Sequence, residues 1–240
     1  MPNRSAQPKG ILFDLDDTLI SAYGRPEVAW LKIAHEFAAA VAPLPPQDFA
    51  AHVTREAKAF WDASPKEWRM NLPEARRVII ERVIKKIRSP LPQDFARTIA
   101  DRYTRLRTDE MHLFPGAHET LDEFKRRGVR LALITNGAGP VQRAKIARFA
   151  LEHRFDHIQI EGEHGFGKPE DQAYRHALAS LDLPAGDVWM VGDNLEWEVE
   201  APQRLGIYAV WHDTHGAGLP ASSPARPDRI ISNLSQLLTD

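Results

Sequence analysis

Three acidic residues follow a short apolar run near the start of the chain, in the segment Asp14-Leu15-Asp16-Asp17. Asp14 and Asp16 are two positions apart, so an extended chain would point both carboxylates to the same side. Close carboxylates repel each other unless a cation or a proton relieves them. A hard cation such as Mg²⁺ prefers oxygen ligands and accepts substrate phosphate as well. One carboxylate could then attack phosphorus while the other transfers protons. The alternative is a solvated acidic turn that closes a strand.

A second group, Thr135-Asn136-Gly137, follows the apolar segment VRLALI. A hydroxyl, a side-chain amide and a glycine N–H at a strand end form a small donor cluster that suits a phosphate oxygen. Asn-Gly is also a strong turn signal, so an ordinary strand-to-helix turn explains the same residues.

Lys168 precedes Pro169 in the segment HGFGKPED. A lysine at the start of a helix opposes the helix dipole, and it is better explained if it neutralises a nearby anion. The sequence predicts Pro169 as the first residue of that helix. A surface lysine in a flexible loop is the alternative.

The fourth group is Gly192-Asp193-Asn194-Leu195-Glu196-Trp197-Glu198, directly after the apolar segment VWMV. Its carboxylates could bind a cation at the end of a buried strand. The same residues also suit a helix start, where Asp193 or Asn194 would be the N-cap and Glu196 and Glu198 would lie in the first turn.

Short apolar runs alternate with helix-like stretches in the parts of the chain that carry these groups. This alternation predicts an α/β fold, with a Rossmann-like parallel sheet and helices on both of its faces. The predicted strands are 10–15, 129–134, 157–160, 188–191, 207–211 and 229–231, and the predicted helices are 117–127, 140–151, 169–181, 195–205 and 233–238. All four groups then fall at the carboxyl ends of strands, where open α/β sheets bind ligands.

The segment between the first two groups, residues 21–111, shows no strand signal. It contains helical patterns at 26–41, 47–62, 73–87 and 93–107, most of them with a proline at or near their start. We interpret it as an all-helical domain inserted after the first strand, so that the α/β domain comprises residues 1–20 and 112–240.

The composition excludes several classes of site. The net charge of -2, from 31 basic and 33 acidic residues, gives no general reason to expect a nucleic-acid or membrane partner. The chain has no cysteine, which excludes disulfides, cysteine nucleophiles and thiolate metal sites. The ten histidines, His164, His212 and His215 among them, show no spacing typical of a metal site. No signal-peptide core or membrane-length apolar run is evident, so we expect a cytoplasmic protein.

In this order, the four groups resemble the phosphatase branch of the haloacid dehalogenase superfamily. The resemblance covers residues 10–19 and 114–238, including Phe114-Pro115-Gly116, and the insert resembles the α-helical cap of the first class in that family. It implies a Mg²⁺-dependent phosphomonoester hydrolase that acts on a small phosphorylated metabolite through an aspartyl-phosphate intermediate.

The resemblance also assigns roles to individual residues. Asp14 is similar to the nucleophile, Asp16 to the general acid and base, and Lys168 to the lysine that steadies Asp14 and the phosphoryl charge. Phosphate would be bound by Thr135, Asn136 and Gly137. Magnesium would be bound by Asp14, by the backbone carbonyl of Asp16 and by Asp193, with Asn194 and Glu198 as outer partners.

One position departs from the family pattern, in which Gly-Asp is followed after four residues by a second Asp. Here that residue is Glu198. The longer carboxylate could reach the metal cluster through a water molecule, or it could contact Lys168 instead.

Three alternatives remain open. Haloacid dehalogenases use the same nucleophile without a metal but lack the second acid, so Asp16 argues against that activity. A phosphomutase would use the same aspartyl-phosphate and is not excluded. A non-catalytic binding protein of this fold would have no physical need for all of the acidic residues and the lysine. Candidates for substrate contacts on the insert combine aromatic faces with positive charge, although packing or a solvated face explains them equally: Tyr23, Arg25, Trp61, Lys66, Trp68 and Arg69.

Overall fold

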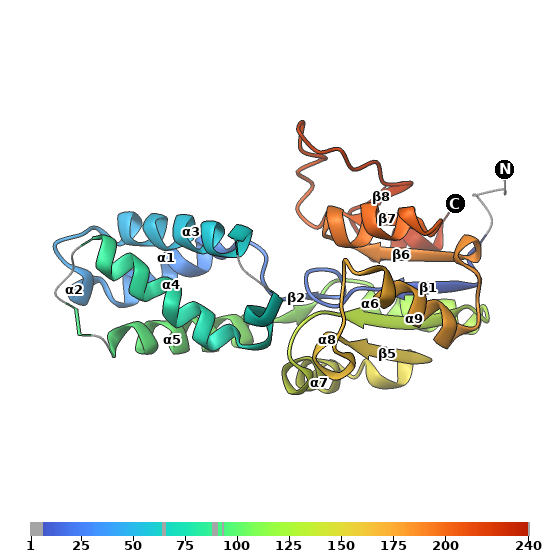
Figure 1. Ribbon diagram of the computed structural model, residues 1–240, viewed down its shortest axis with the longest axis horizontal. Coiled ribbons are helices and arrows are strands. Elements are labelled where there is room, and N and C mark those ends of the chain that lie inside the picture. Colours follow the sequence, from blue (N-terminus) through green and yellow to red (C-terminus); the bar gives the residue numbers. More distant parts are fainter. Residues whose placement is uncertain (1–6, 64–65, 88–90, 93, 240) are drawn as a thin grey trace. The chain divides into compact units, whose positions relative to one another are not determined.

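The computed structural model describes residues 7–63, 66–87, 91–92 and 94–239. The chain divides into two compact units, an α/β unit of Met1–Ser21 with His112–Asp240 and a helical unit of Ala22–Met111 (Figure 1). Each unit has its own hydrophobic core.

A six-stranded sheet forms the centre of the α/β unit. Its strands are β1 (Gly10–Phe13), β4 (Arg130–Thr135), β5 (His157–Ile160), β6 (Val188–Gly192), β7 (Tyr208–His212) and β8 (Arg229–Ile231). They lie in the order β5-β4-β1-β6-β7-β8, and every neighbouring pair is parallel. The predicted parallel sheet is therefore confirmed, and β1 lies in its interior between β4 and β6.

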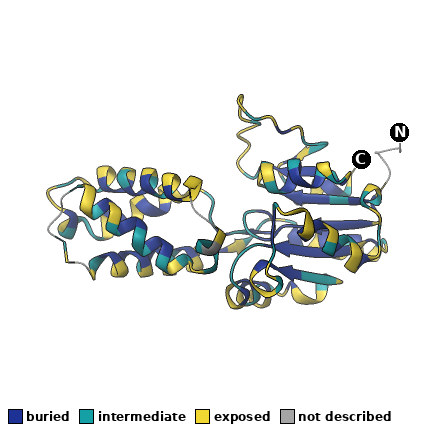
Figure 2. Cartoon of the chain, viewed as in Figure 1, coloured by how far each residue is buried: buried dark blue, intermediate teal, exposed yellow. Residues whose placement is uncertain are grey.

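Helices cover the sheet because its central strands are apolar on both sides. All four residues of β1 are buried, as are five of the six in β4. Around the sheet lie α6 (Ala117–Arg126), α7 (Gly139–Arg148), α8 (Glu161–His164), α9 (Asp171–Leu181) and α10 (Ala201–Arg204). Tyr174, Ala177 and Leu181 of α9 pack against Leu12 and Met190 of the strands. Figure 2 shows the buried residues concentrated on the strands and on the inward sides of the helices.

Three predicted helices of the α/β unit differ in detail. The helix predicted to begin at Pro169 begins at Asp171, because the backbone of Glu170 is extended, with ψ 130°. The helix predicted over 195–205 is a π-helical segment, Leu195–Glu200, followed by α10. Pro202 has no N–H to donate, so a regular α-helix cannot continue through this point without losing a hydrogen bond. The final predicted helix is a short 3₁₀ helix, Leu234–Leu238, capped by Asn233.

The helical unit contains α1 (Pro26–Glu36), α2 (Ala38–Val41), α3 (Pro46–Ala63), a 3₁₀ helix (Lys66–Met70), α4 (Leu72–Lys86) and α5 (Phe95–Glu110). Phe49, Val53, Ile79 and Ile99 are among the residues of its apolar core. The helix predicted over 26–41 is interrupted at Phe37, whose ring packs edge-to-face against Phe95. The predicted start of the last helix, Gln93, lies outside the described residues.

Two short strands, β2 (Ile20–Ser21) and β3 (His112–Leu113), pair antiparallel where the chain leaves and re-enters the α/β unit. The Phe114 N–H donates to the Leu19 carbonyl directly beside this pair. No helix in the described residues is long and apolar enough to cross a membrane.

Candidate active site

Three of the predicted groups meet at the carboxyl edge of the sheet because of the strand order. Thr135 ends β4, Asp14 follows β1 directly, and Asp193 follows β6 directly. β1 lies between β4 and β6 in a parallel arrangement, so these three residues emerge side by side. The Asp14 N–H donates to the Val191 carbonyl at 3.0 Å, which continues the ladder one residue past β1 and fixes the Asp14 backbone.

Lys168 lies between two buried carboxylates. Its Nζ is 2.5 Å from Asp14 Oδ1 and 2.7 Å from Glu198 Oε1, and its side chain is 1% exposed. Burial alone would lower the pKa of Lys168, but the charges of Asp14 and Glu198 outweigh it and raise that pKa. Lys168 therefore stays a cation, and its ammonium group holds Asp14 and Glu198 on either side of it.

Glu198 is held in place by the turn after β6. Its Oε2 accepts a hydrogen bond from the Asn194 N–H at 2.7 Å, while its Oε1 contacts Lys168. The turn is possible because residue 192 is glycine: a Cβ there would lie 2.0 Å from Glu198 Cγ. Burial raises the pKa of Glu198 to about 7, against the opposing charge of Lys168. Of the two positions considered for this carboxylate, the structure shows the contact with Lys168.

Asn194 has a structural role. Its side-chain oxygen accepts hydrogen bonds from the N–H groups of Glu196 and Trp197, both at 3.0 Å, so it caps the π-helical segment. This confirms the N-cap interpretation for Asn194. Its role as an outer partner of a cation stays a prediction.

Asp193 adds a further carboxylate next to Asp14 and Glu198. Its Oδ1 lies 3.4 Å from the Thr18 hydroxyl, and its carbonyl accepts a hydrogen bond from Trp211 Nε1 at 2.7 Å. Burial, followed by the charges of Glu198, Asp14 and Asp17, raises the pKa of Asp193 well above its ordinary value. Burial and the neighbouring Asp16 also raise the pKa of Asp14, although Lys168 offsets part of this. One ammonium group is thus too little charge to balance these carboxylates.

This donor set fits a hard divalent cation. The available ligands are carboxylate and carbonyl oxygens, which Mg²⁺ prefers, and a cation would relieve the charge that raises the two aspartate pKa values. Asp14 and Asp193 could supply carboxylate oxygens. Asp16 could contribute only its backbone carbonyl in this arrangement, because its side chain is engaged elsewhere.

The Asp16 carboxylate is held by two residues that the sequence analysis did not single out. Lys145 Nζ lies 2.7 and 2.8 Å from its two oxygens, and Gln142 Nε2 donates to Oδ2 at 2.9 Å. Gln142 also donates to the Thr135 hydroxyl, so it links the first and second groups. Gln142 and Lys145 are buried polar residues three positions apart on α7. That spacing on the helix face towards the core was the available signal.

Asn136 binds the loop that carries Lys168. Its side-chain amide donates to the Lys168 carbonyl at 2.7 Å and accepts from the Lys168 N–H at 2.9 Å. The chains approach this closely because residue 167 is glycine: a Cβ there would lie 2.5 Å from Asn136 Oδ1. Both functional atoms of the amide are therefore occupied in positioning Lys168.

Two members of the predicted phosphate-donor cluster have protein partners in this structure. The Gly137 N–H donates to Glu161 Oε2 at 3.0 Å, and the Asn136 amide is bound to Lys168. Phosphate binding by Thr135, Asn136 and Gly137 stays a prediction. Thr135 is buried, and its hydroxyl shares Gln142 with Asp16.

The candidate substrate contacts of the insert differ in their surroundings within the helical unit. Trp68 packs edge-to-face on Phe60 and belongs to the margin of the apolar core, whereas Trp61 is 39% exposed. Arg25 precedes α1 with a positive φ of 51° and is exposed, as is Lys66. Contact of these residues with a substrate stays a prediction, and so does that of Tyr23 and Arg69.

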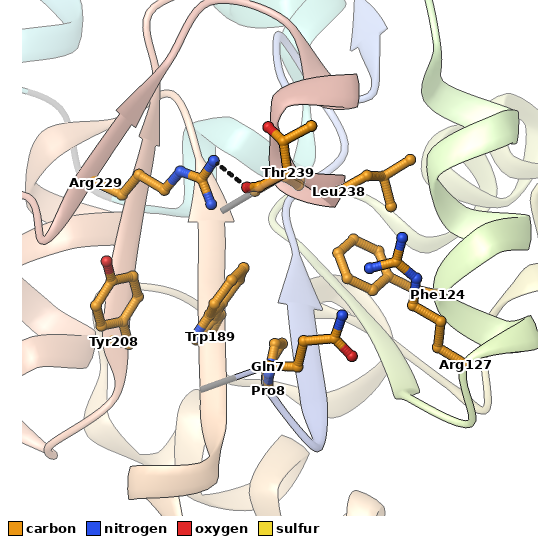
Figure 3. A pocket seen from close by; sticks show the side chains of 10 residues that line it. Gln7, Pro8, Phe124, Arg127, Trp189, Tyr208, Arg229, Leu238 and Thr239 are labelled. Carbon is orange, nitrogen blue, oxygen red and sulfur yellow. Dashed lines mark hydrogen bonds between the residues drawn. The ribbon is translucent and has the colours of Figure 1, made fainter. Parts of the chain in front are cut away.

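A separate hollow lies at the opposite edge of the sheet (Figure 3). Trp189 and Tyr208, near the amino-terminal ends of β6 and β7, line it with ring centroids 5.4 Å apart. Arg229 also lines it and donates to the Thr239 carbonyl at 2.7 Å. None of the predicted site residues is among the residues that line this hollow. The acidic residues of the candidate active site lie at the carboxyl edge instead.

Comparison with known proteins gives two informative relatives. A phosphoserine phosphatase from Thermus thermophilus is 37% identical over 143 residues, which are 59% of this chain and 56% of that protein. A glyceraldehyde 3-phosphate phosphatase from Pyrococcus furiosus is 27% identical over 232 residues, which are 96% of this chain and 91% of that protein. Several curated relatives, the Thermus phosphatase among them, are matched over only about half of their length.

Solved structures share the fold over nearly the whole chain. YfnB of Bacillus subtilis, in a magnesium-bound crystal form, has a TM-score of 0.71 at 20% identity, and a 2-haloacid dehalogenase from Pseudomonas syringae has 0.62 at 24%; each covers 97% of both chains. At these identities the likeness shows the fold alone. The family model of haloacid dehalogenase-like hydrolases matches residues 8–206, and the chain belongs to that family.

Proposed function

We propose that this protein is a magnesium-dependent phosphomonoesterase that acts on a small phosphorylated metabolite through an aspartyl-phosphate on Asp14. The observation that carries the proposal is the contact between Lys168 and Asp14 at the carboxyl edge of the sheet. The lysine holds a buried carboxylate in one orientation, next to a second acid that can transfer protons. This is the arrangement that nucleophilic attack on phosphorus needs.

The proposed reaction has two steps. A carboxylate oxygen of Asp14 forms a bond to phosphorus, and the bond from phosphorus to the ester oxygen breaks. Asp16 gives its proton to the departing oxygen, which leaves as the alcohol. Asp16 then takes a proton from a water molecule as the water oxygen forms a bond to phosphorus. The bond from phosphorus to the Asp14 oxygen breaks, so that inorganic phosphate is released and both carboxyl groups return to their starting forms.

Two residues on α7 would position the proton-transfer group. Lys145 and Gln142 fix both oxygens of Asp16, and Gln142 ties it to Thr135. Because hydrogen-bonded groups on a helix hold their geometry better than groups on a free loop, Asp16 would meet the leaving oxygen in a defined orientation. Lys168 would balance negative charge as the phosphoryl group arrives at Asp14.

Magnesium, bound by Asp14, Asp193 and the Asp16 carbonyl, would neutralise phosphate charge and orient the phosphoryl group. Glu198 would act through Lys168, to which it is bound at 2.7 Å. Glu198 would therefore not bind the cation directly.

The substrate class follows from the chemistry and from the relatives. Two relatives named above are phosphatases of phosphoserine and of glyceraldehyde 3-phosphate, both small phosphate esters. We therefore propose a small phosphorylated metabolite as the substrate. A cytoplasmic location belongs to the same proposal, since it fits such a substrate and a chain without cysteine.

Hydrolysis of p-nitrophenyl phosphate, measured with Mg²⁺ and after exhaustive chelation, tests this proposal. We expect turnover only with the divalent cation, and none for Asp14→Asn, whose amide cannot form the acyl-phosphate. Rapid acid quenching during turnover should yield a phosphorylated peptide that contains Asp14. Full activity after chelation, or activity of Asp14→Asn, would show that the mechanism is wrong.

The same assay separates the alternatives. A dehalogenase would release chloride from 2-chloropropionate without a metal, and a mutase would transfer the phosphoryl group to an added sugar phosphate. Screening small phosphate esters, including phosphoserine and glyceraldehyde 3-phosphate, then identifies the preferred substrate by kcat/KM.

A further inference from the structure

We propose that His157, His164 and His176 form a second metal site in the α/β unit, one that binds a transition-metal cation such as Zn²⁺. His157 is the first residue of β5, His164 is the last residue of α8, and His176 lies in α9. In the described part of the chain, no other group of three or more histidine or acidic side chains brings its possible ligand atoms this close together.

The three rings converge closely enough to share one ion. One ring nitrogen from each lies within 4.8 Å of the others, and the ring centroids are 5.1 to 6.2 Å apart. Nitrogen ligands about 2.0–2.1 Å from a tetrahedral Zn²⁺ are roughly 3.4 Å from each other. Small side-chain rotations at these half-buried positions would close the difference.

Hydrogen bonds at Nδ1 of two rings fix which nitrogen can bind a metal. His164 Nδ1 lies 3.1 Å from the Ile160 carbonyl, and His176 Nδ1 lies 2.8 Å from Gln159 Oε1. Both partners are oxygen acceptors, so each Nδ1 carries the proton and each Nε2 keeps its lone pair. Gln159 is itself fixed, because its Nε2 donates to the Ala173 carbonyl at 3.0 Å. Ring orientation by a hydrogen bond from the other nitrogen is a usual feature of metal-binding histidines.

The third ring has a polar atom that the described protein leaves unsatisfied. His157 Nε2 is inaccessible to solvent and has no hydrogen-bond partner among the described residues. A buried polar atom without a partner costs free energy, and a bound cation would remove that cost. Burial, together with His176 and His164, also lowers the pKa of His157, and burial lowers the pKa of His176. Neutral imidazole is the form that binds metal.

The ligand type separates this cluster from the acidic site. Imidazole suits Zn²⁺, Ni²⁺ and Cu²⁺, whereas Mg²⁺ prefers oxygen. Three histidines would leave one tetrahedral position for water. The two proposed sites would therefore bind different ions from the same solution.

The cluster borders the segment that leads to Lys168. The Phe166 ring lies 5.8 Å from that of His164 and 5.4 Å from that of His176, and Lys168 follows two residues later. An ion bound by His157, His164 and His176 would tie α8, α9 and β5 together on both sides of this segment. Its expected effect is to stabilise the α/β unit around the loop of Lys168.

Metal binding by tag-free protein tests the proposal, with Co²⁺ as the probe and excess Mg²⁺ present to saturate the acidic site. We expect one Co²⁺ per chain, a visible absorption band, displacement by Zn²⁺ and a higher Tm. His164→Gln and His176→Gln should each weaken Co²⁺ binding by at least about 10- to 100-fold. Loss of a residue that only supports a metal ligand already costs about that much, and these variants remove a ligand itself. The matched control is His153→Gln, an exposed histidine outside the cluster, which should bind as the wild type does.

An Asp193→Ala variant distinguishes the two sites, since it should keep the Co²⁺ band even if it loses phosphatase activity. The Tm of each histidine variant without metal shows whether it is folded. Wild-type protein that binds no Co²⁺ in excess Mg²⁺, or folded variants that bind it as tightly as the wild type, would overturn the proposal. Neither result depends on whether the protein is a phosphatase.

Discussion

The side-chain amide of Asn136 holds the backbone of Lys168 with both of its polar atoms, donating at 2.7 Å and accepting at 2.9 Å. The two residues are 32 positions apart and leave different strands of the sheet. Through this pair of hydrogen bonds, the loop after β4 determines where the ammonium group of Lys168 stands relative to Asp14.

The first prediction concerns that pair. Asn136→Ala removes both hydrogen bonds, so Lys168 should move relative to Asp14 and kcat should fall by about 10²-fold, as small misplacements of catalytic groups commonly cause. Steady-state kinetics measures the effect. Asn233→Ala is the control, because Asn233 caps only the terminal 3₁₀ helix. Unchanged kcat in Asn136→Ala would mean that other contacts suffice to place Lys168.

The second prediction concerns Lys145. Lys145→Met removes the ammonium group that binds both oxygens of Asp16 while it keeps a long apolar side chain on α7. We expect kcat to fall by about 10-fold or more, with a smaller change in KM, because Asp16 loses its orientation for proton transfer. Arg148→Met, at an exposed position of the same helix, should be nearly neutral. Equal kcat in the two variants would remove Lys145 from the mechanism.

The third prediction separates Glu198 from Asp193. Asp193→Ala should raise the Mg²⁺ concentration needed for half-maximal rate, because it removes a proposed ligand. Glu198→Ala should instead lower the rate by about 10- to 100-fold at saturating Mg²⁺, since it leaves Lys168 with one carboxylate partner. Rate against Mg²⁺ concentration distinguishes these effects. If both variants shift the Mg²⁺ requirement alike, Glu198 is a direct ligand.

The fourth prediction concerns the turn after β6. A Cβ on residue 192 would meet Glu198 Cγ at 2.0 Å, so Gly192→Ala should destabilise the protein by about 1–3 kcal/mol through overpacking. Urea unfolding measures the change in the free energy of unfolding. Gly186→Ala is the control, because a Cβ there has no heavy atom of the described structure within 4 Å. Similar stabilities of the two variants would show that the turn can widen freely.

The fifth prediction is the pH dependence of stability without metal. Burial raises the pKa of Glu198 from 4.5 to about 7, so the neutral acid is the form favoured by folding. The corresponding contribution to stability is fully present below about pH 4.5 and is lost as the pH rises through about 7. Glu198→Gln cannot titrate, so the Tm of the chelated wild type should fall relative to this variant across that interval. Parallel Tm curves would contradict the assignment.

The sequence by itself determined the sheet and the location of its chemistry. Asp14, Thr135 and Asp193 each follow an apolar run, and parallel strands place such residues at one edge whatever the details of packing. The alternation of apolar runs with amphipathic stretches likewise predicted the α/β fold. Helix ends were less well determined, because a proline such as Pro169 suits both the first turn of a helix and the loop before it.

Only the tertiary structure decided how the side chains are partnered. Lys168 meets Asp14 across 154 positions, and Lys145 meets Asp16 across 129, through loops whose paths the local pattern does not encode. The close approach at Gly167 brings the Asn136 amide to the backbone of Lys168, a contact that the sequence analysis did not predict. The cluster of His157, His164 and His176 has no recognisable spacing because a strand and two helices assemble it. The positions of strands and helices follow largely from local sequence patterns, whereas side-chain partners depend on the packing of distant segments.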